Sequence, residues 1–323
     1  MTATAPQPID YRKLRIVFMG TPEFAVASLD ALVQAGCSIV GVVTAPDKPA
    51  GRGMQLRESA VKSYALAHQL PVLQPIKLRD PAFLQELQNL QADLQVVVAF
   101  RMLPELVWKM PPLGTINVHG SLLPRYRGAA PINWAVINGE TETGVTTFQL
   151  QHEIDTGGIL LQEAFSIGPD ETAGEVHDRM KEIGARLLVT TIQEMAAGTL
   201  TPQPQPAAAP GTDLPHAPKL FTDTCRIHFD LPVTQVHNLV RGLSPFPGAF
   251  TTLQGKILKI FRSDKEEVKP AQPPGSVVTD GKQFLRFACA DGYLLCREVQ
   301  LEGKKKMGIE EFLRGYRPDA GNA

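Results

Sequence analysis

Two polar side chains, two positions apart in a predicted strand, have the chemistry needed for acyl transfer. Asn117 and His119 lie in the apolar run TINVH at 115–119, which is typical of a buried strand. Successive side chains of a strand point to opposite faces, so Asn117 and His119 share one face and Val118 points to the other. An amide beside an imidazole suits the stabilisation of a developing oxyanion. A histidine in a strand can also have a structural role alone, so the pair is compatible with either a catalytic or a structural role.

Asp155 is a third candidate, because it lies in the loop HEIDTGG at 152–158, directly after a strand predicted at 144–151. A carboxylate that returns to His119 would orient the imidazole and support a positive charge on it. The same aspartate could instead form an Asx-turn with Thr156 and the following glycines. The sequence around Asp155 does not decide between these two roles.

The elements that must position these residues alternate between strands and helices. Strands are predicted at 14–19, 38–44, 94–99, 115–119 and 144–151, and helices at 25–36, 58–68, 80–90, 131–139 and 171–197. Buried strands that alternate with helices predict a Rossmann-like parallel sheet covered on both faces. Ligands of such folds bind at the carboxyl ends of the strands. The turn Gly20-Thr21-Pro22 follows the first strand, but it lacks the G-x-G-x-x-G spacing and so argues against a nicotinamide site.

The C-terminal third has a different pattern. Six prolines and little periodicity mark residues 199–219 as a linker. Short strand-like runs follow, among them ILKIF, SVVT, FLRFAC and YLLCREV, separated by turn residues, and they predict a small β-barrel or sandwich. We therefore predict an α/β domain at 1–198, a linker at 199–219, a β domain at 220–317 and a tail at 318–323.

Composition places the chain among ordinary globular proteins. Its 323 residues predict two domains, and the fractions of hydrophobic (43%) and charged (20%) residues argue against disorder. No apolar run is long enough to cross a bilayer and the start lacks a secretory h-region, so we expect a cytoplasmic protein. The four scattered cysteines predict reduced thiols, and the seven histidines show no metal-ligand spacing, so no metal is expected.

Charge is distributed unevenly between the two predicted parts. Residues 1–218 carry 16 Lys/Arg and 21 Asp/Glu, whereas residues 219–317 carry 16 Lys/Arg and 11 Asp/Glu. The second part therefore has an excess of five positive charges. This excess is compatible with a polyanionic partner and equally with a solvated surface.

A long stretch of the chain resembles a known family. The segments NVHGSLLPRYRGAAPINWA and ETGVTTFQLQHEIDTG resemble the formyltransferases that use 10-formyltetrahydrofolate. The resemblance implies a catalytic trio of Asn117, His119 and Asp155. It also implies that the folate is bound by Ser121, Leu122, Leu123 and Pro124 and, through backbone groups in particular, by Arg101, Met102 and Leu103. The run FRML at 100–103 is similar to the nucleotide-acting branch, whereas many tRNA-acting relatives have glycine after the aromatic residue.

Other segments resemble the branch of this family that acts on methionyl-tRNA. The segment PDKPAGRGMQL at 46–56 is similar to a loop that meets the acceptor arm, and its Arg52 matches a functional arginine. Taken alone, this segment would be a mobile surface loop. LVRGLSPFPGAFTTLQGKILKI and VQLEGKKKMGIEEFLRG are similar to that branch's C-terminal domain, which implies a β-barrel of the oligonucleotide-binding type. Lys304, Lys305 and Lys306 are the candidates for phosphate contacts, although Lys-rich turns are also common soluble connections.

The resemblance implies that the protein is a monomer, that it transfers a one-carbon group, and that it acts in translation initiation. It would move a formyl group from 10-formyltetrahydrofolate to the α-amino group of methionyl-initiator-tRNA, giving N-formylmethionyl-tRNA. An amino-sugar or nucleotide formyltransferase would share the trio, and a folate-dependent hydrolase would use water as the acceptor. A non-catalytic folate- or tRNA-binding protein would not need the trio.

Overall fold

The computed structural model describes residues 8–50, 55–207 and 213–316. The chain divides into two compact units: the first comprises residues 1–127, 144–164 and 178–215, and the second comprises residues 128–143, 165–177 and 216–323. Both units are therefore built from segments that are distant in the sequence. The boundaries predicted from composition at 198 and 219 stay a prediction.

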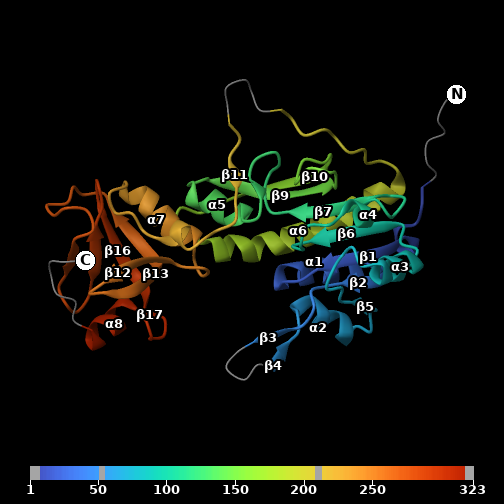
Figure 1. Ribbon diagram of the computed structural model, residues 1–323. Helices are drawn as coiled ribbons and strands as arrows, with labels where there is room; N and C mark the ends of the chain where they lie inside the picture. The colour runs from blue at the N-terminus through green and yellow to red at the C-terminus, as the bar shows by residue number, and fades with distance from the viewer. Residues whose placement is uncertain (1–7, 51–54, 208–212, 317–323) are drawn as a thin grey trace. The chain divides into compact units, whose positions relative to one another are not determined.

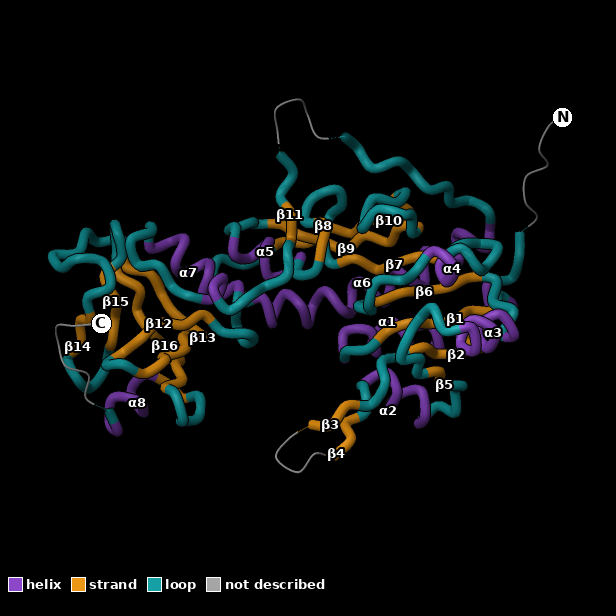
Figure 2. Tube along the Cα trace, in the orientation of Figure 1, coloured by secondary structure: helices purple, strands orange, loops and turns teal. Residues whose placement is uncertain are grey.

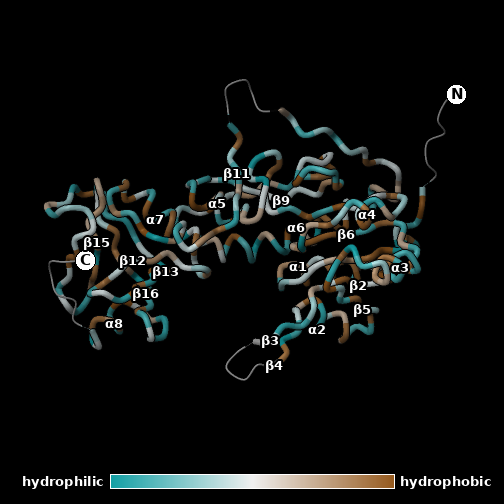
Figure 3. The backbone as a smooth tube through the Cα atoms, viewed as in Figure 1, coloured by the Kyte–Doolittle hydropathy of each residue, from teal (hydrophilic) through white to brown (hydrophobic). Residues whose placement is uncertain are grey.

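A largely parallel sheet forms the centre of the first unit. Its strand order is β10-β9-β7-β6-β1-β2-β5 (Figure 1). The strands are β1 (Arg15–Gly20), β2 (Ser38–Val43), β5 (Val72–Leu73), β6 (Leu94–Val98), β7 (Thr115–His119), β9 (Glu142–Gln149) and β10 (Ile159–Ser166). Strand β1 runs parallel to β2 and β6, and β6 runs parallel to β7, but β9 is antiparallel to β7. The central strands are among the most hydrophobic segments of the chain (Figure 3), as expected for a sheet covered on both faces.

Helices cover both faces of this sheet. They are α1 (Glu23–Gln34), α2 (Ala60–Ala67), α3 (Pro81–Asn89), α4 (Glu105–Trp108) and α6 (Ala173–Ala197), with a short 3-10 turn at Tyr11–Lys13. On one face, Phe83 and Leu87 of α3 and Val107 of α4 pack in a core with Met19 and Val97 of the sheet. Helix α3 begins where Asp80 accepts a hydrogen bond from the backbone N–H of Ala82, with proline at the first turn.

The opposite face of the sheet is covered by α6. A Cβ added to Gly184 would lie 3.2 Å from Val118, and the hydroxyls of Thr191 and Thr147 lie 2.8 Å apart. Because Val118 and Thr147 face one another across β7 and β9, the helix contacts the face that carries Val118. Asn117 and His119 are thereby left on the other face.

The turn after β1 requires a glycine. A Cβ on Gly20 would lie 2.6 Å from the Cβ of Ala25 in α1 and 3.1 Å from the carbonyl oxygen of Val98. Gly20 thus allows α1 to pack closely against the carboxyl end of the sheet. The Gly-Thr-Pro turn has at least this structural role.

The second unit is built around an antiparallel sheet of order β12-β13-β16-β15-β14, with β17 paired to β16. The strands are β12 (Ala249–Leu253), β13 (Lys256–Glu266), β14 (Val277–Thr279), β15 (Leu285–Ala288), β16 (Tyr293–Leu301) and β17 (Met307–Gly308). Also in this unit are α5 (Pro131–Ile137), α7 (Val233–Gly242), α8 (Ile309–Gly315) and the 3-10 turn Asp223–Cys225. The two-residue strands β8 (Arg127–Gly128) and β11 (His216–Ala217) pair with one another. Register shifts in β13 near Arg262 interrupt its pairing with β16 and are the kind of irregularity that bends a sheet.

The sheet of the second unit encloses an apolar core with α7 and α8. Leu258, Phe287 and Leu294 from the strands are fully buried, together with Val240 of α7 and Leu313 of α8. The predicted fold class is confirmed: a Rossmann-like parallel-sheet domain is accompanied by an antiparallel half-barrel.

The sequence predicted the long elements of the first unit, but several smaller ones were missed. A hairpin of β3 (Lys48–Ala50) and β4 (Gln55–Arg57) occupies the segment expected to be a loop. In the Pro-rich segment, residues 199–207 are drawn as a loop after α6 (Figure 2), yet Gln203 pairs through its backbone with Ile159 of β10. The prolines and the lack of periodicity predicted a linker in this segment, but they did not predict how the segment packs.

A capping box begins α6. The carboxylate of Glu175 accepts hydrogen bonds of 2.8 Å from both the backbone N–H and the hydroxyl of Thr172, and it accepts a 2.6 Å bond from Arg262. Burial alone would raise the pKa of Glu175, but the hydrogen bonds from Arg262 and Thr172 outweigh it and lower the pKa to about 2. The ionised carboxylate is therefore the form that the fold stabilises.

This depressed pKa predicts acid sensitivity of the second unit. An unfolded glutamate has a pKa of about 4.3, so the contribution of Glu175 is fully present above that pH and is lost as the pH falls toward about 2. We expect Glu175→Gln to destabilise the protein at about pH 7 and to flatten the loss of stability between about pH 5 and 2. Urea unfolding followed by circular dichroism measures both effects. Glu310→Gln, at an exposed position of α8, is the control, and an equal flattening in that variant would contradict the assignment.

Candidate active site

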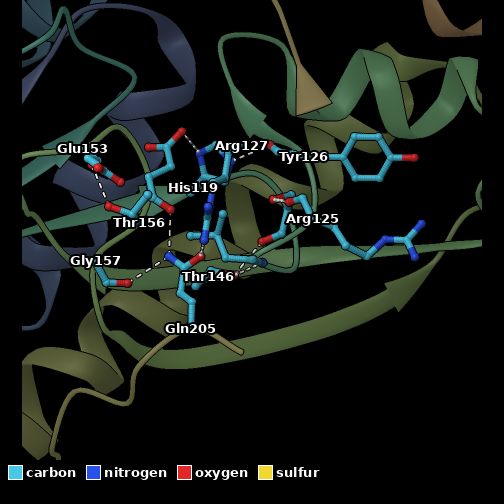
Figure 4. Close-up of polar contacts among 12 residues, drawn as sticks. His119, Arg125, Tyr126, Arg127, Thr146, Glu153, Thr156, Gly157 and Gln205 are labelled. Atoms are coloured by element: carbon cyan, nitrogen blue, oxygen red, sulfur yellow. Dashed lines mark hydrogen bonds and ion pairs between the residues drawn. The ribbon is translucent and has the colours of Figure 1, made fainter. Parts of the chain in front are cut away.

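His119 is the last residue of β7, and both of its ring nitrogens face groups of the protein (Figure 4). Nε2 lies 2.9 Å from the carbonyl oxygen of Tyr126, and Nδ1 lies 3.7 Å from Oδ2 of Asp155. The side chains of His119 and Asp155 are only 7% and 11% exposed. The structure therefore brings together the histidine and the aspartate that were predicted as partners.

The contact with Tyr126 fixes which ring nitrogen carries a hydrogen. A carbonyl oxygen only accepts hydrogen bonds, so Nε2 must be the donor to Tyr126. Nδ1 is then the nitrogen at which a proton can arrive or leave. The 3.7 Å from Nδ1 to Asp155 is longer than a hydrogen bond but short enough for strong attraction if Nδ1 is protonated.

Asn117 shares the face of β7 with His119, as predicted from their spacing. It is half-buried, and its side-chain amide makes no hydrogen bond within the part of the chain that the structure describes. Its cross-strand neighbour is Phe148, whose ring meets the His119 ring edge to face at 6.3 Å between centroids. Phe148 thus packs against the imidazole, while the N–H donors of the Asn117 amide are not used by protein groups of the described residues.

The loop that carries Asp155 has a constrained backbone. Asp155 has φ of 55°, in the left-handed region that aspartate tolerates better than most residues. A Cβ on Gly157 would lie 1.7 Å from the carbonyl oxygen of Gln149, so only glycine fits there. This close approach folds the loop back toward the end of β7.

The segment 121–124, predicted to bind folate, forms a turn secured by neighbouring strands. Thr146 of β9 donates its hydroxyl to the carbonyl of Ser121 at 2.6 Å and accepts a hydrogen bond from the backbone N–H of Leu123 at 3.1 Å. Gln162 of β10 donates to the carbonyl of Leu123 at 3.0 Å. Ser121 and Leu123 are buried, whereas Leu122 and Pro124 are half-buried. Of these four residues, Leu122 and Pro124 are therefore the ones whose side chains a ligand can reach.

The segment 101–103 follows β6 at the same edge of the sheet. Arg101 donates to the backbone carbonyls of Ile76, at 2.9 Å, and Pro75, and burial lowers the pKa of its guanidinium. Met102 is 75% exposed. Within the described residues, the backbone N–H and C=O groups of 100–103 make no hydrogen bond to other protein groups, so they are available to a ligand.

A cavity of about 520 Å³ lies beside α4. It is lined by Arg79, Pro104, Glu105, Leu106, Lys109 and Met110.

Of the residues predicted to contact tRNA, the structure describes the three lysines but not Arg52. Arg52 lies outside the described residues, between the two strands of the β3–β4 hairpin. The hairpin is anchored at Asp47, whose hydrogen bonds from Lys62 and Gln74 lower the pKa of its carboxyl group.

The three predicted lysines of the second unit are all exposed. Lys305 forms an ion pair with Glu311 at 3.3 Å, and Lys306 forms one with Glu298 at 2.9 Å. Within the described residues, Lys304 has no ion-pair partner. Its charge is the least compensated of the three.

The sequence did not indicate several groups around His119. They are the carbonyl of Tyr126, the hydroxyl of Thr146 and the side chain of Gln205, which donates to the carbonyl of Asp155 at 2.7 Å. A backbone carbonyl has no sequence signature, and Gln205 lies in a Pro-rich segment without periodicity. Only the length of the segment NVHGSLLPRYRGAAPINWA at 117–135, over which the chain resembles the family, indicated that more than the trio matters there.

Comparison with known proteins assigns this site to a family. The formyl transferase family model matches residues 14–192, and the model of the formyl transferase C-terminal domain matches residues 219–317. The chain therefore belongs to the formyl transferase family, and the resemblance inferred from its motifs is confirmed.

Curated relatives are similar to the chain over most of its length. A methionyl-tRNA formyltransferase of Bacteroides fragilis is 52% identical over 308 residues, covering 94% of this chain and 95% of the relative. One of Parabacteroides distasonis is 54% identical over 311 residues, covering 94% and 96%. Within the family, the sequence is thus similar to the methionyl-tRNA branch that the 46–56 loop indicated.

Solved structures show the same fold at lower identity. WlaRD, a sugar 3N-formyl transferase crystallised with dTDP and 5-N-formyl-THF, has a TM-score of 0.66 at 19% identity and covers 90% of this chain and 99% of its own. HypX from Aquifex aeolicus in complex with tetrahydrofolic acid has a TM-score of 0.64 at 19% identity and covers 95% and 48%. These likenesses establish the fold alone.

Two further findings concern the described residues. None of their helices is both long and apolar enough to cross a membrane. They also contain no cluster of three or more His, Cys, Asp or Glu side chains with the geometry to hold a metal ion.

Proposed function

We propose that this protein transfers a formyl group from 10-formyltetrahydrofolate to the α-amino group of methionine on initiator tRNA. Membership of the formyl transferase family and identities of about one half to methionyl-tRNA formyltransferases over 94% of the chain support the proposal. The observation that carries it is the buried His119, set between the Asp155 carboxylate and the Tyr126 carbonyl on the same strand face as Asn117.

In the proposed reaction the neutral amine attacks the formyl carbon. An α-amine has a pKa of about 8, so roughly a tenth of it is already neutral near pH 7 and strong general-base activation is not needed. The attack forms a C–N bond and a tetrahedral oxyanion. Collapse of this intermediate breaks the bond between the formyl carbon and the folate nitrogen, and the proton lost by the amine ends on that nitrogen.

We assign the stabilisation of the oxyanion to Asn117 and protonated His119. The Asn117 amide has two N–H donors, and a proton on Nδ1 of His119 would give the ring a positive charge beside the reacting atoms. Asp155, 3.7 Å from Nδ1, would stabilise that charge. Nδ1 of His119 and the Asp155 carboxylate can each accept a proton, and they lie 3.7 Å apart. We therefore infer that proton exchange during the reaction occurs at these two groups.

We assign the folate site to two neighbouring turns. The backbone groups of 100–103 have no protein partners within the described residues, which suits recognition of a pterin ring by paired donors and acceptors. The turn at 121–124 would provide an apolar wall through Leu122 and Pro124. In this assignment, backbone geometry matters more than the identity of Arg101 or Met102.

We assign contacts with the tRNA to Arg52 and to the lysines 304–306 of the second unit. Lys304 is the strongest phosphate candidate because Lys305 and Lys306 already pair with Glu311 and Glu298. Since the proposed acceptor belongs to translation, we further propose that the protein works in the cytoplasm, and that it works as a monomer, which sedimentation analysis can test.

A comparison of acceptors tests the proposed function directly. Purified protein is given 10-formyltetrahydrofolate with charged initiator methionyl-tRNA, with uncharged tRNA or with an amino sugar, and the formylated product is measured. We expect product with the charged tRNA alone. Formylation of the amino sugar in preference to methionyl-tRNA would overturn the proposed acceptor, and hydrolysis of the folate without an acceptor would indicate a hydrolase.

His119→Asn tests the catalytic role of the imidazole. Loss of an oxyanion-stabilising group costs about 100- to 1,000-fold in turnover, so we expect kcat to fall by that factor while folate affinity changes little. Single-turnover kinetics and folate titration separate the two quantities. His68→Asn, at the exposed end of α2, is the matched control. Unchanged kcat in His119→Asn would refute the assignment.

Arg52→Ala tests the role of the segment 46–56. If Arg52 contacts the acceptor arm, its removal should raise KM for methionyl-tRNA by about 10-fold and leave KM for the folate within about 2-fold. Steady-state kinetics with each substrate varied in turn measures both constants. Lys13→Ala removes an exposed charge from the same unit as a control. Equal changes in the two KM values would count against the assignment.

Lys304→Ala tests the phosphate contact in the second unit. A lysine that binds one phosphate contributes about one to the slope of log affinity against log salt concentration, so that slope should become shallower by about one. Filter binding of tRNA at increasing salt gives the slope. Lys282→Ala, in the exposed turn between β14 and β15, should leave it unchanged. A Lys304→Ala slope equal to that of the unmodified protein would exclude this contact.

A further inference from the structure

The chain segment after α6 lies alongside the loop that carries Asp155. The backbones of Gln203 and Ile159 exchange two hydrogen bonds, of 2.7 and 2.8 Å. A Cβ added to Gly158 would lie 2.8 Å from Pro202, so this stretch is packed tightly against the glycine pair. The segment is therefore fixed beside the site at the point where Gln205 follows.

The side-chain amide of Gln205 connects two other segments (Figure 4). Its Nε2 donates to the carbonyl oxygens of Asp155, at 2.7 Å, and Gly157, at 2.9 Å. Its Oε1 accepts hydrogen bonds from Nε and Nη2 of Arg127, at 3.1 and 2.5 Å. An amide has two donor hydrogens and two acceptor lone pairs, so these four contacts use its full capacity and fix its orientation.

Both segments that Gln205 connects also contact His119. The Asp155 carboxylate faces Nδ1 of the imidazole at 3.7 Å. Arg127 directly follows Tyr126, whose carbonyl oxygen accepts the hydrogen bond from Nε2 at 2.9 Å. A single side chain thus links the backbones on the two sides of the histidine ring.

The Asp155 loop needs such a support because of its backbone conformation. A φ of 55° at Asp155 is sparsely populated for a residue with a Cβ and persists only where surrounding contacts hold it. The two bonds from Gln205 hold the carbonyls of Asp155 itself and of Gly157, two residues further on. Without them, rotation of these peptide groups would move the carboxylate relative to Nδ1.

We propose that Gln205 is a positioning residue that sets the separation of Asp155 from His119 by holding the Asp155 loop against Arg127. The proposal rests on the catalytic roles proposed for His119 and Asp155. Gln205 contacts their backbone supports and not the reacting atoms, so its effect is transmitted through the geometry of the pair.

Gln205→Ala and Gln205→Met test this proposal. Small misplacements of catalytic groups cost up to about 100-fold, so we expect kcat to fall by about 10-fold or more in both variants, with KM for each substrate within about 2-fold. Methionine keeps approximately the length of glutamine without its hydrogen bonds, and therefore separates hydrogen bonding from packing. Full kcat in Gln205→Met would overturn the proposal.

Gln205→Glu and Gln203→Ala complete the comparison. Glutamate keeps the acceptor for Arg127 but as a carboxylate cannot donate to the two carbonyls, so its kcat should also fall. Gln203 lies two residues away, and among the described residues its Nε2 donates only to the carbonyl of Thr201, at 3.1 Å. Gln203→Ala should therefore keep normal kcat. Equal losses in Gln203→Ala and Gln205→Ala would show a general effect of the segment and overturn the specific role.

A double-mutant cycle distinguishes positioning from a structural effect. If Gln205 acts through Asp155, then Gln205→Ala should reduce kcat by less than about 2-fold in an Asp155→Asn background. Multiplicative losses would overturn the proposal. Nitrogen NMR of the His119 ring gives a readout independent of turnover, and its Nδ1 signal should shift in Gln205→Ala but not in Gln203→Ala.

These experiments also separate failure of this inference from failure of the proposed function. Normal turnover in both His119→Asn and Asp155→Asn would refute the catalytic roles on which the inference rests. Large losses in those two variants with normal turnover in Gln205→Ala would refute the positioning role alone.

Discussion

A buried imidazole has two ring nitrogens, and each must face a suitable group or pay for its desolvation. His119 meets this requirement with a carbonyl on one side and a carboxylate on the other. The turn after β7 must therefore return to present the Tyr126 carbonyl, and the loop after β9 must fold back to present Asp155. Thr146 and Gln205 contact these two returning segments, and Gly157 lets the Asp155 loop pass close to Gln149 of β9. Much of the local structure therefore follows from this one constraint.

The sheet determines where this imidazole can lie. β7 places Asn117 and His119 on one face, while α6 packs against Val118 and Thr147 on the other. The face that carries Asn117 and His119 is thus free of the long helix, and β6 and β7 lie side by side at their carboxyl ends. The turns at 100–103 and 121–124 begin at these two ends, which brings the groups proposed for folate and for catalysis to one edge of the sheet.

The two units would divide the proposed work between chemistry and recognition. The first unit holds the trio and the candidate folate turns, whereas residues 219–317, which contain the antiparallel half-barrel of the second unit, have an excess of positive charge. Pairing of Lys305 and Lys306 with Glu311 and Glu298 shows that an excess of charge does not make every lysine available to a phosphate. Counting charges along the sequence could identify the basic region, but it could not select among its lysines.

The sequence by itself determined the alternation of buried strands and helices, the shared face of Asn117 and His119, and the family, because apolar periodicity and long motifs are local properties of the chain. Tertiary structure alone decided the 3.7 Å approach of Asp155 to His119, the carbonyl partner of Nε2 and the four contacts of Gln205. These contacts join residues as far as 78 positions apart. Their formation depends on how the loops pack after the sheet has formed, which no spacing rule within one segment encodes.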